Sequence, residues 1–363
     1  MPVRIVHAAD FHLDSAFGAL SAEQAKLRRR ESRATAERLA NYINQNGIDV
    51  VLLAGDLFDG ETTYRETVEQ LLEALGSMSA HVFIAPGNHD FYSARSLYAA
   101  LPWPENVHIF KTREIERVEL PELGCAVYGA AFTAPAQETS LLAGFHAPED
   151  GLVRLGVLHA DLNAAEARYD SVTREEIAAS GLDYLALGHT HEYGGVCRAG
   201  GTAYAYSGCI EGHGFDELGE RGFLTGTVER GGAALEFVPF ARRRYEILRV
   251  AVTGKTPEAA LREALPADTA RDLYRVILTG ETDERGVDLR ALTERFGPEF
   301  FSLELRDKTR IGEDVWARAE EDSLRGAFLR ELRAQYEQAG EEARAVIERA
   351  ARFGLAALDE RDL

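Results

Sequence analysis

Short apolar runs alternate with amphipathic stretches over the first 240 residues of this 363-residue chain, and this alternation limits the folds available to it. Arg4 to Ala8 has the pattern of a strand, and Ser21 to Gln24 forms a capping box that begins a helix reaching about Asn46. Val50 to Ala54 is apolar on both faces, as in a central strand covered on both sides. A helix and a further strand are expected next, at residues 63–75 and 81–85. This succession predicts a largely parallel sheet.

The strand pattern changes after a group of glycines at positions 194, 195, 200 and 201. Up to that point, further strands are expected at residues 126–131, 152–159 and 184–188, with a capped helix beginning at Thr173. Around and after the glycines, short strands with close turns are expected at residues 193–198, 203–207, 222–228 and 234–240. Close turns are typical of antiparallel hairpins, so we expect these strands to form a second sheet packed on the first.

Three parts are expected along the chain: residues 1–241, residues 242–312 and residues 313–363. The middle part has the pattern of a small α/β module, with strands at residues 245–252, 273–279 and 300–306. The last part is rich in Ala, Arg, Glu and Leu and has the pattern of two helices separated by Gly340. Their apolar stripes require burial, either against the chain itself or against a partner.

Composition places the chain among soluble globular proteins, with 45% hydrophobic and 28% charged residues and no apolar run as long as a membrane span. The N-terminus enters a strand pattern directly and lacks a secretory signal, so we expect a cytoplasmic protein. The 40 basic and 60 acidic residues give a formal net charge of −20, which argues against binding of polyanions through bulk charge. Cys125, Cys197 and Cys209 lack the spacing of a zinc or redox motif and are expected to be buried thiols.

Five polar clusters stand at the carboxyl ends of expected strands, where open α/β sheets bind their ligands. They are Asp10 to His12, Gly55 to Asp59, Gly87 to Asp90, His159, and Gly188 to His191. Any one of them is explained by an ordinary turn, but together they place carboxylates, imidazoles and one amide on one rim. Alternate residues of an extended segment project to the same side, so each DxH or HxH pair can face one site.

These side chains are suited to divalent cations. Asp, Asn and His are ligands for Mn²⁺, Fe²⁺ or Zn²⁺, and a candidate thiolate is missing from the clusters, which argues against a soft metal. Seven such ligands exceed what one ion can use, whereas two ions that share a bridging carboxylate would use them all. Two ions about 3.5–4 Å apart are a standard arrangement for displacement at phosphorus. The pattern therefore predicts a two-metal site for Mn²⁺, Fe²⁺ or Zn²⁺.

The order DxH, GDxxD, GNHD, H, GHxH resembles the calcineurin-like metallophosphoesterase superfamily over about 190 residues. Within it, residues 7–15 (HAADFHLDS) and the small module resemble the DNA-repair exonuclease branch of SbcD- and YhaO-like nuclease subunits. The resemblance implies an α/β fold, a two-sheet αββα sandwich with a capping domain and a helical tail. It also implies that one ion is bound by Asp10, His12 and His191, the other by Asn88, His159 and His189, with Asp56 as the bridge.

The resemblance also assigns catalytic roles. His89 would approach the scissile phosphate and stabilise charge or protonate the leaving oxygen, and Asp90 would orient His89. Asp59 stands where related proteins often carry a second phosphate-facing histidine, so a supporting role is expected for it. Phosphoprotein phosphatases usually have an Arg directly after that Asp, whereas this chain has Gly60, which weakens that interpretation.

Substrate contacts are expected at two places. Residues 206–215 resemble the family's substrate-side loop, although Ser207 replaces its usual Pro, and His213 there either faces DNA or caps a turn. Arg242, Arg243 and Arg244 lie at the boundary of the small module and either hold phosphates or serve as linker surface. The basic residues of the first helix, from Lys26 to Arg33, are better explained as a solvated, ion-paired surface.

We therefore expect a two-metal phosphodiesterase acting on DNA: a Mn²⁺-dependent exonuclease, with endonuclease activity on single strands, serving DNA repair. The resemblance implies an SMC-like coiled-coil ATPase as partner, bound through the C-terminal helices, and a homodimer. One alternative keeps the chemistry but acts on small nucleotides or cyclic phosphodiesters. Another, outside the enzymes, is an inactive scaffold for the ATPase.

Overall fold

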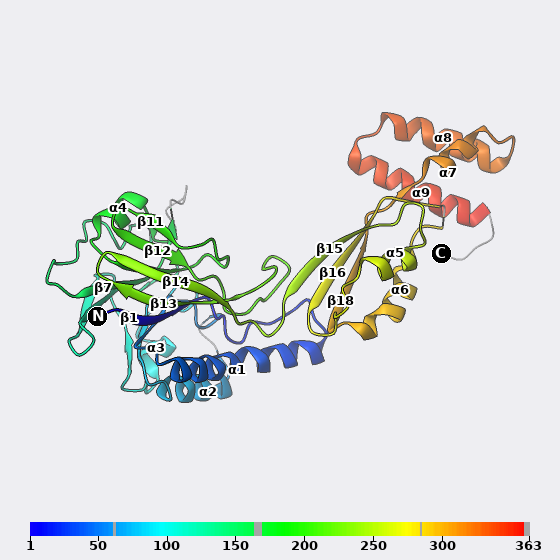
Figure 1. Ribbon diagram of the computed structural model, residues 1–363. Helices are drawn as coiled ribbons and strands as arrows, with labels where there is room; N and C mark the ends of the chain where they lie inside the picture. The colour runs from blue at the N-terminus through cyan, green and yellow to red at the C-terminus, as the bar shows by residue number, and fades with distance from the viewer. Residues whose placement is uncertain (61–62, 163–168, 284, 359–363) are drawn as a thin grey trace. The chain divides into compact units, whose positions relative to one another are not determined.

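The computed structural model describes residues 1–60, 63–162, 169–283 and 285–358. The chain divides into two compact units, Met1–Arg244 and Tyr245–Leu363, which are described one at a time (Figure 1). Among the described residues, every helix is too short or too polar to cross a membrane. The helical part predicted for residues 313–363 includes residues 359–363, which lie outside the described residues.

The first unit contains two sheets of six strands each. The first sheet has the order β14-β13-β1-β2-β3-β4, in which β1 to β4 run parallel. Its strands are β1 (Val3–Ala8), β2 (Val50–Leu53), β3 (His81–Ile84), β4 (Val107–Ile109), β13 (Gly222–Glu229) and β14 (Gly232–Pro239). The second sheet has the order β11-β12-β10-β7-β6-β5. Its strands are β5 (Glu116–Leu120), β6 (Cys125–Gly129), β7 (Val153–His159), β10 (Tyr184–Gly188), β11 (Cys197–Ala199) and β12 (Thr202–Tyr206).

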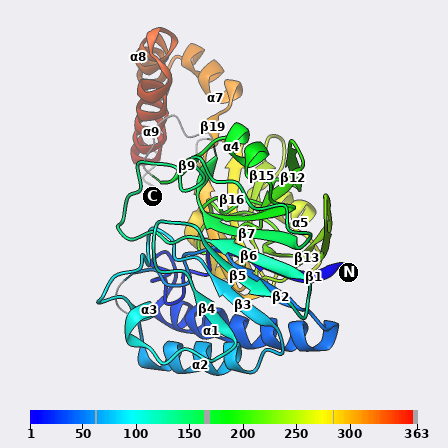
Figure 2. The same ribbon diagram turned by 90° about the vertical axis from the view of Figure 1, so that its left-hand side faces the viewer.

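Helices cover the outer faces of both sheets. Figure 2 shows α1 (Ala22–Asn46) and α2 (Arg65–Gly76) side by side on the first sheet, where Leu39 and Leu71 pack with Val51. On the second sheet, Ile177 of α4 (Arg174–Ala179) packs against Leu185. Short elements complete the unit: α3 (Leu97–Ala100), β8 (Asp161–Leu162) and β9 (Ser171–Val172).

A buried apolar layer joins the two sheets. Ile5 and Leu52 of the first sheet belong to the same core cluster as Val127, Leu155 and Ala186 of the second. The unit is therefore an α-β-β-α sandwich, which confirms the fold class expected from the sequence.

The expectation that the four hairpin-like strands form the second sheet was wrong. Only β11 and β12 join that sheet, whereas β13 pairs antiparallel with β1 in the first sheet, with Val3 opposite Val228. The β13–β14 hairpin thus extends the parallel sheet at its open edge. Local alternation identifies a strand and its turn but not the distant partner whose edge it completes. Strands β4 and β5 were not expected at all.

The ends of α1 match the sequence signals. The Ser21 side chain accepts from the backbone N–H of Gln24, and the Gln24 side chain binds back, which completes the capping box. Gly47 ends the helix in the left-handed conformation at φ 58°. This helix supplies the buried residues that anchor the loop around His213.

The second unit begins with a parallel sheet of order β15-β16-β18. Leu261 of α5 and Phe296 of α6 pack with Val250 and Val276 on one face of that sheet. A second apolar cluster joins Trp316, Leu329 and Leu355 of the C-terminal helices. The elements are β15 (Tyr245–Ala251), α5 (Pro257–Ala264), β16 (Leu273–Thr279), β17 (Glu281–Thr282), α6 (Leu289–Phe296), β18 (Ser302–Asp307), β19 (Arg310–Ile311), α7 (Glu313–Ala317), α8 (Leu324–Gln338) and α9 (Glu341–Leu358), with 3₁₀ turns at Gly297–Glu299 and Arg318–Glu320.

Candidate metal centre

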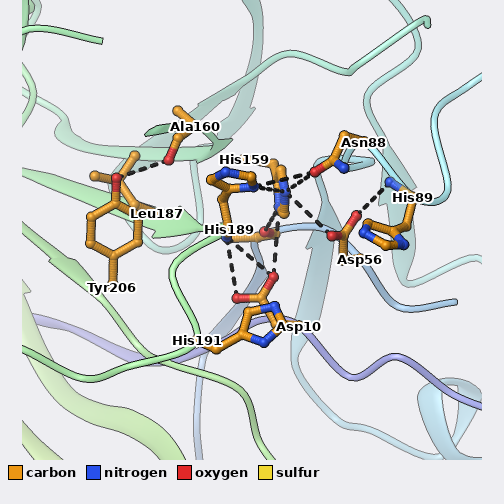
Figure 3. Close-up of polar contacts among 12 residues, drawn as sticks. Asp10, Asp56, Asn88, His89, His159, Ala160, Leu187, His189, His191 and Tyr206 are labelled. Atoms are coloured by element: carbon orange, nitrogen blue, oxygen red, sulfur yellow. Dashed lines mark hydrogen bonds and ion pairs between the residues drawn. The ribbon is translucent and has the colours of Figure 1, made fainter. Parts of the chain in front are cut away.

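The five polar clusters converge at the carboxyl ends of strands from both sheets. Strands β1, β2 and β3 lead into Asp10, Asp56 and Asn88, whereas β7 ends at His159 and β10 leads into His189. Figure 3 shows these side chains, together with His191, turned toward one common centre. The arrangement follows from the parallel order of the strands, since their carboxyl ends meet at the same edge.

The first set of donor atoms comes from Asp10, His12 and His191. Nε2 of His12 lies 3.2 Å from Nε2 of His191, so both rings present the same nitrogen to the centre. One oxygen of Asp10 lies with these nitrogens inside a group whose members are all within 4.8 Å of one another. The Asp10 carboxylate also accepts from the backbone N–H of His189 at 3.2 Å, which fixes its position.

The second set comes from Asn88, His159 and His189. Oδ1 of Asn88 lies 2.9 Å from Nε2 of His159 and 3.3 Å from Nδ1 of His189. The two imidazole nitrogens are 3.3 Å apart. These three atoms therefore face one point from the ends of three different strands, β3, β7 and β10.

Asp56 lies between the two sets. Its Oδ2 is 3.7 Å from Nε2 of His12 and 3.5 Å from Nε2 of His159. Its other oxygen, Oδ1, accepts from the backbone N–H of His89 at 3.0 Å. The same carboxylate oxygen thus borders both donor sets, as a bridging ligand must.

Three of the histidines are held from behind, through the ring nitrogen that points away from the centre. Nδ1 of His159 donates to the carbonyl oxygen of Ala54 at 3.0 Å, and Nδ1 of His12 lies 3.2 Å from the Asp59 carboxylate. Nδ1 of His191 hydrogen-bonds to Oε1 of Glu217. Such outer partners fix the tautomer and the ring orientation of a metal-ligating histidine.

Burial strongly perturbs the ionisable groups of the centre. Burial, followed by repulsion from Asp56, raises the pKa of Asp10 to about 7. Burial lowers the pKa of His159 to about 4, and burial with repulsion from His159 does the same for His189. Burial disfavours a charge on His12, but the hydrogen bond to Asp59 and the nearby Asp56 outweigh it and raise its pKa to about 9. His159 and His189 are therefore neutral near pH 7, the form that binds metal.

The backbone is strained where the donors sit. Asp10, His12, Asp56 and His189 have φ angles of 52°, 41°, 51° and 101°, a region that residues other than glycine rarely adopt. Such strain persists only where the surrounding structure enforces it, and it gathers at functional sites. Gly87 is required by packing as well, since a Cβ there would lie 2.2 Å from Oδ1 of Asp56.

The donor set fits two divalent cations. Carboxylate, amide and imidazole groups converge on two points, and the buried, mutually repelling carboxylates of Asp10 and Asp56 would be stabilised by positive charge. Asp10, His12 and His191 would hold one ion, Asn88, His159 and His189 the other, and Asp56 would serve both.

His89 lies beside the donor sets and is partly open to solvent. Its ring packs edge-on against His12 with 4.9 Å between the centroids, and its side chain is 46% exposed. The Asp59 carboxylate lies 3.8 Å from its Nδ1. The imidazole is therefore accessible from solvent beside the donor sets.

Among the described residues, the Asp90 carboxylate contacts backbone groups and Tyr98, and the orienting role expected for it stays a prediction. Its buried carboxylate accepts from the backbone N–H groups of Leu57, Phe58 and Gly87 at 2.7, 3.2 and 2.8 Å. It also accepts from the hydroxyl of Tyr98 at 2.6 Å. Asp90 thus joins the loops that carry Asp56 and His89 and acts through their backbone, whereas Asp59 is the carboxylate beside the His89 ring.

The predicted substrate-contact residues lie in two places. His213 lies beside the first donor set, whereas Arg242 and Arg243 lie near Glu31 of α1. His213 stacks on Phe17 with 5.6 Å between ring centroids and lies 5.7 Å from the His12 ring, beside the first donor set. Arg243 pairs with Glu31 of α1 at 2.8 Å, and Nε of Arg242 lies 3.5 Å from the same carboxylate. Arg244 is the last residue of the first unit. Contact of these arginines with a substrate stays a prediction.

Tyr98 and Glu217 lay outside every motif in the sequence, and Glu211 lies within residues 206–215 but no role was expected for it. Glu217 holds His191, Tyr98 holds Asp90, and Glu211 accepts hydrogen bonds from Arg28, Arg38 and Thr35 beneath the His213 loop. No spacing in the chain marks them, because their partners are 8 to 183 residues away.

The prediction of buried thiols is confirmed for two of the three cysteines. Cys125 and Cys209 are buried free thiols, whereas Cys197 is half-buried.

Comparison with known proteins agrees with this geometry. The family model of calcineurin-like phosphoesterases matches residues 3–193. An uncharacterized metallophosphoesterase, YhaO of Bacillus subtilis, is 30% identical over 254 residues, which are 67% of this chain and 60% of YhaO. The DNA double-strand break repair protein Mre11 of Methanopyrus kandleri is 23% identical over 338 residues, or 86% of this chain and 72% of that protein.

A further relative covers less of the chain. SbcD, the D component of the SbcCD nuclease of Bacillus subtilis, is 25% identical over 141 residues, which are 37% of this chain and 34% of SbcD. The match to the family model contains Asp10, Asp56, Asn88, His159 and the His189–His191 pair. The chain belongs to the calcineurin-like phosphoesterase family.

Proposed function

We propose that this protein is a two-metal phosphodiesterase whose substrate is DNA. The observation that carries the proposal is the position of Asp56, whose Oδ2 lies 3.7 and 3.5 Å from nitrogens of two separate donor sets. One shared carboxylate between two sets of N and O donors is the arrangement required by two closely spaced ions.

The chemistry divides between the ions and the protein. Two bound ions would supply Lewis-acid stabilisation of charge on the phosphoryl oxygens and lower the pKa of an attacking water. The chain itself orients the donors, and His89, which is 46% exposed, would donate a proton or a hydrogen bond to the leaving oxygen. Asp59, which lies near both His12 and His89, supports the two rings together.

The names of two relatives favour DNA as the substrate. Mre11 is a DNA double-strand break repair protein and the SbcCD protein is a nuclease, although their identities to this chain are only 23% and 25%. The formal net charge of −20 does not argue against DNA binding at the site. Bound cations would reverse the sign of the local charge around Asp10 and Asp56. We infer exonuclease activity, with endonuclease activity on single strands, in DNA repair.

Mn²⁺ is the proposed metal, with Fe²⁺ and Zn²⁺ as alternatives. The donors are carboxylate, amide and imidazole groups, which suit these three ions, and the thiol of Cys209 lies near His191 but has a pKa raised by burial. A thiol kept protonated in this way is a poor ligand.

We also propose an SMC-like coiled-coil ATPase as partner. The C-terminal helices α8 and α9 expose Leu324, Val346 and Phe353, at 74%, 63% and 57% of their surface. Apolar side chains on two adjacent helices suit a helical partner.

We propose three functional parts: residues 1–241 form the nuclease domain, residues 242–312 the capping domain and residues 313–363 the ATPase-binding region. The proposed protein is cytoplasmic and forms a homodimer.

A cleavage assay tests the substrate directly. The protein with Mn²⁺ is incubated with end-labelled duplex and single-stranded DNA, and in parallel with bis(p-nitrophenyl) phosphate. We expect cleavage of DNA, and a loss of about 10²–10⁴-fold in rate for His89→Ala. The matched control is His146→Ala, which removes an exposed imidazole that hydrogen-bonds to Ala179 outside the donor sets.

Two results would contradict the proposal. Rapid hydrolysis of the small ester with intact DNA, with and without a coiled-coil ATPase, would favour a phosphodiesterase for small nucleotides. No hydrolysis of either substrate with bound metal would favour the scaffold.

A further inference from the structure

Glu217 contacts two histidines with different roles, one through each carboxylate oxygen. Oε1 binds Nδ1 of His191, the ring that presents Nε2 to the first donor set. Oε2 accepts from the backbone N–H of His213 at 2.5 Å and lies 3.3 Å from Nδ1 of the His213 ring. One buried side chain therefore fixes a candidate metal ligand and the loop beside it.

The segment that carries Glu217 also holds His191 by its backbone. The carbonyl oxygen of His191 accepts from the backbone N–H of Cys209 at 3.2 Å and from the side chain of Arg221. Both residues flank the loop, one before His213 and one after Glu217. Ring and backbone of His191 are thus held by a single stretch of chain.

The base of this loop is anchored in the core of the first unit. Glu211, which is fully buried, accepts from Arg28 at 3.2 Å and from Arg38 at 2.9 Å, both on α1. Arg28 also donates to the carbonyl oxygen of Gly212 at 3.1 Å. The base of the loop, next to His213, is therefore fixed to α1.

The other donor set has different supports. His159 is held by the carbonyl oxygen of Ala54 and Asn88 by contact with His159 and His189. Within the described part of the chain, the Glu217 carboxylate contacts His191 and His213 rather than these three residues. Removing its carboxylate should thus affect the two ion sites unequally.

We propose that Glu217 is a positioning residue that sets the affinity of the ion site formed by Asp10, His12 and His191, and links that site to the substrate-side loop through His213. The inference rests on the two-ion site of the proposed function but not on DNA as the substrate. Outer-shell partners of ligating histidines typically contribute about 10–100-fold to metal affinity.

Calorimetric titration of the full chain with Mn²⁺, without substrate, tests this proposal. The wild type should bind two ions, and Glu217→Ala should weaken one of them by about 10–100-fold while leaving the other unchanged. Glu217→Gln should give an intermediate affinity, because its amide oxygen still accepts from Nδ1 of His191. Asp216→Ala, which removes the neighbouring exposed carboxylate, is the matched control and should bind both ions like the wild type.

Unchanged affinity for both ions in Glu217→Ala and Glu217→Gln would overturn the proposal, as would equal weakening of both. Thermal unfolding of each variant in chelator separates lost binding from lost structure, and the milder Glu217→Gln keeps the test decisive if Glu217→Ala does not fold. A wild type that binds two ions but leaves DNA intact would contradict the proposal that DNA is the substrate. It would not contradict the role proposed for Glu217. A wild type that binds fewer than two ions would overturn both.

Discussion

The backbone N–H of His89 donates to Oδ1 of Asp56 at 3.0 Å and leaves Oδ2 facing both donor sets. The turn that carries the proposed acid thus also orients the proposed bridging ligand. A change in this turn should disturb ion binding and proton donation together, although Asp56 follows β2 and His89 follows β3.

Gly87→Ala tests this coupling. The added Cβ would lie 2.2 Å from Oδ1 of Asp56, so the carboxylate must leave its place between the donor sets. We expect the loss of at least one Mn²⁺ and a fall of about 100-fold or more in phosphodiesterase activity, since the bridge would be displaced. Gly194→Ala, at a position with open space around the new Cβ, should behave like the wild type. Full ion binding by Gly87→Ala would show that the Asp56–His89 contact is dispensable.

Tyr98→Phe tests the role of Asp90. The hydroxyl of Tyr98 donates to Asp90 at 2.6 Å inside the core, and its removal should cost about 1.5–3 kcal/mol of unfolding free energy. Chemical denaturation measures this loss. The Gly87 amide, which donates to the same carboxylate, should also exchange its hydrogen faster. Wild-type stability together with unchanged exchange would mean that Asp90 needs no support from Tyr98.

Glu211→Ala tests the buried ion network under the His213 loop. Arg28 is fully buried and pairs with both Glu31 and Glu211, so removal of Glu211 leaves excess positive charge in the core. We expect a loss of about 3–5 kcal/mol in urea denaturation. The matched control is Glu69→Ala, whose partner Arg65 is exposed, and this substitution should leave the free energy of unfolding nearly unchanged. Similar costs for the two variants would contradict the assignment.

Asp170→Asn tests a pH dependence at a residue outside the donor sets. Burial raises the pKa of the Asp170 carboxyl from 3.8 to about 7, so the folded chain holds this proton more tightly than the unfolded chain does. The resulting stability is fully present below pH 3.8 and is lost as the pH rises through about 7. Between pH 5 and 8 the wild type should lose about 2–3 kcal/mol relative to Asp170→Asn. Parallel stability curves for the two proteins would contradict this pKa.

Local sequence signals predicted most of the first unit. The capping boxes at Ser21 and Thr173 and the doubly apolar run at Val50 identified their elements to within a residue or two. The partner of β13 could not be predicted, because pairing of Val228 with Val3 joins residues far apart in the chain. The same applies to the site, where motifs pointed to the donors but not to Glu217, whose contacts depend on how the loop folds back.

Two ions that share Asp56 must lie close together, and the magnetic coupling between two bound Mn²⁺ ions reports this closeness. Electron paramagnetic resonance of the protein loaded with two equivalents should show a spin-coupled pair, because a shared carboxylate holds the ions about 3.5–4 Å apart. Asp56→Asn should lose one ion or give uncoupled signals. A wild type with two magnetically isolated Mn²⁺ ions, or with a single ion at saturating metal, would contradict the sharing of Asp56 by two ions.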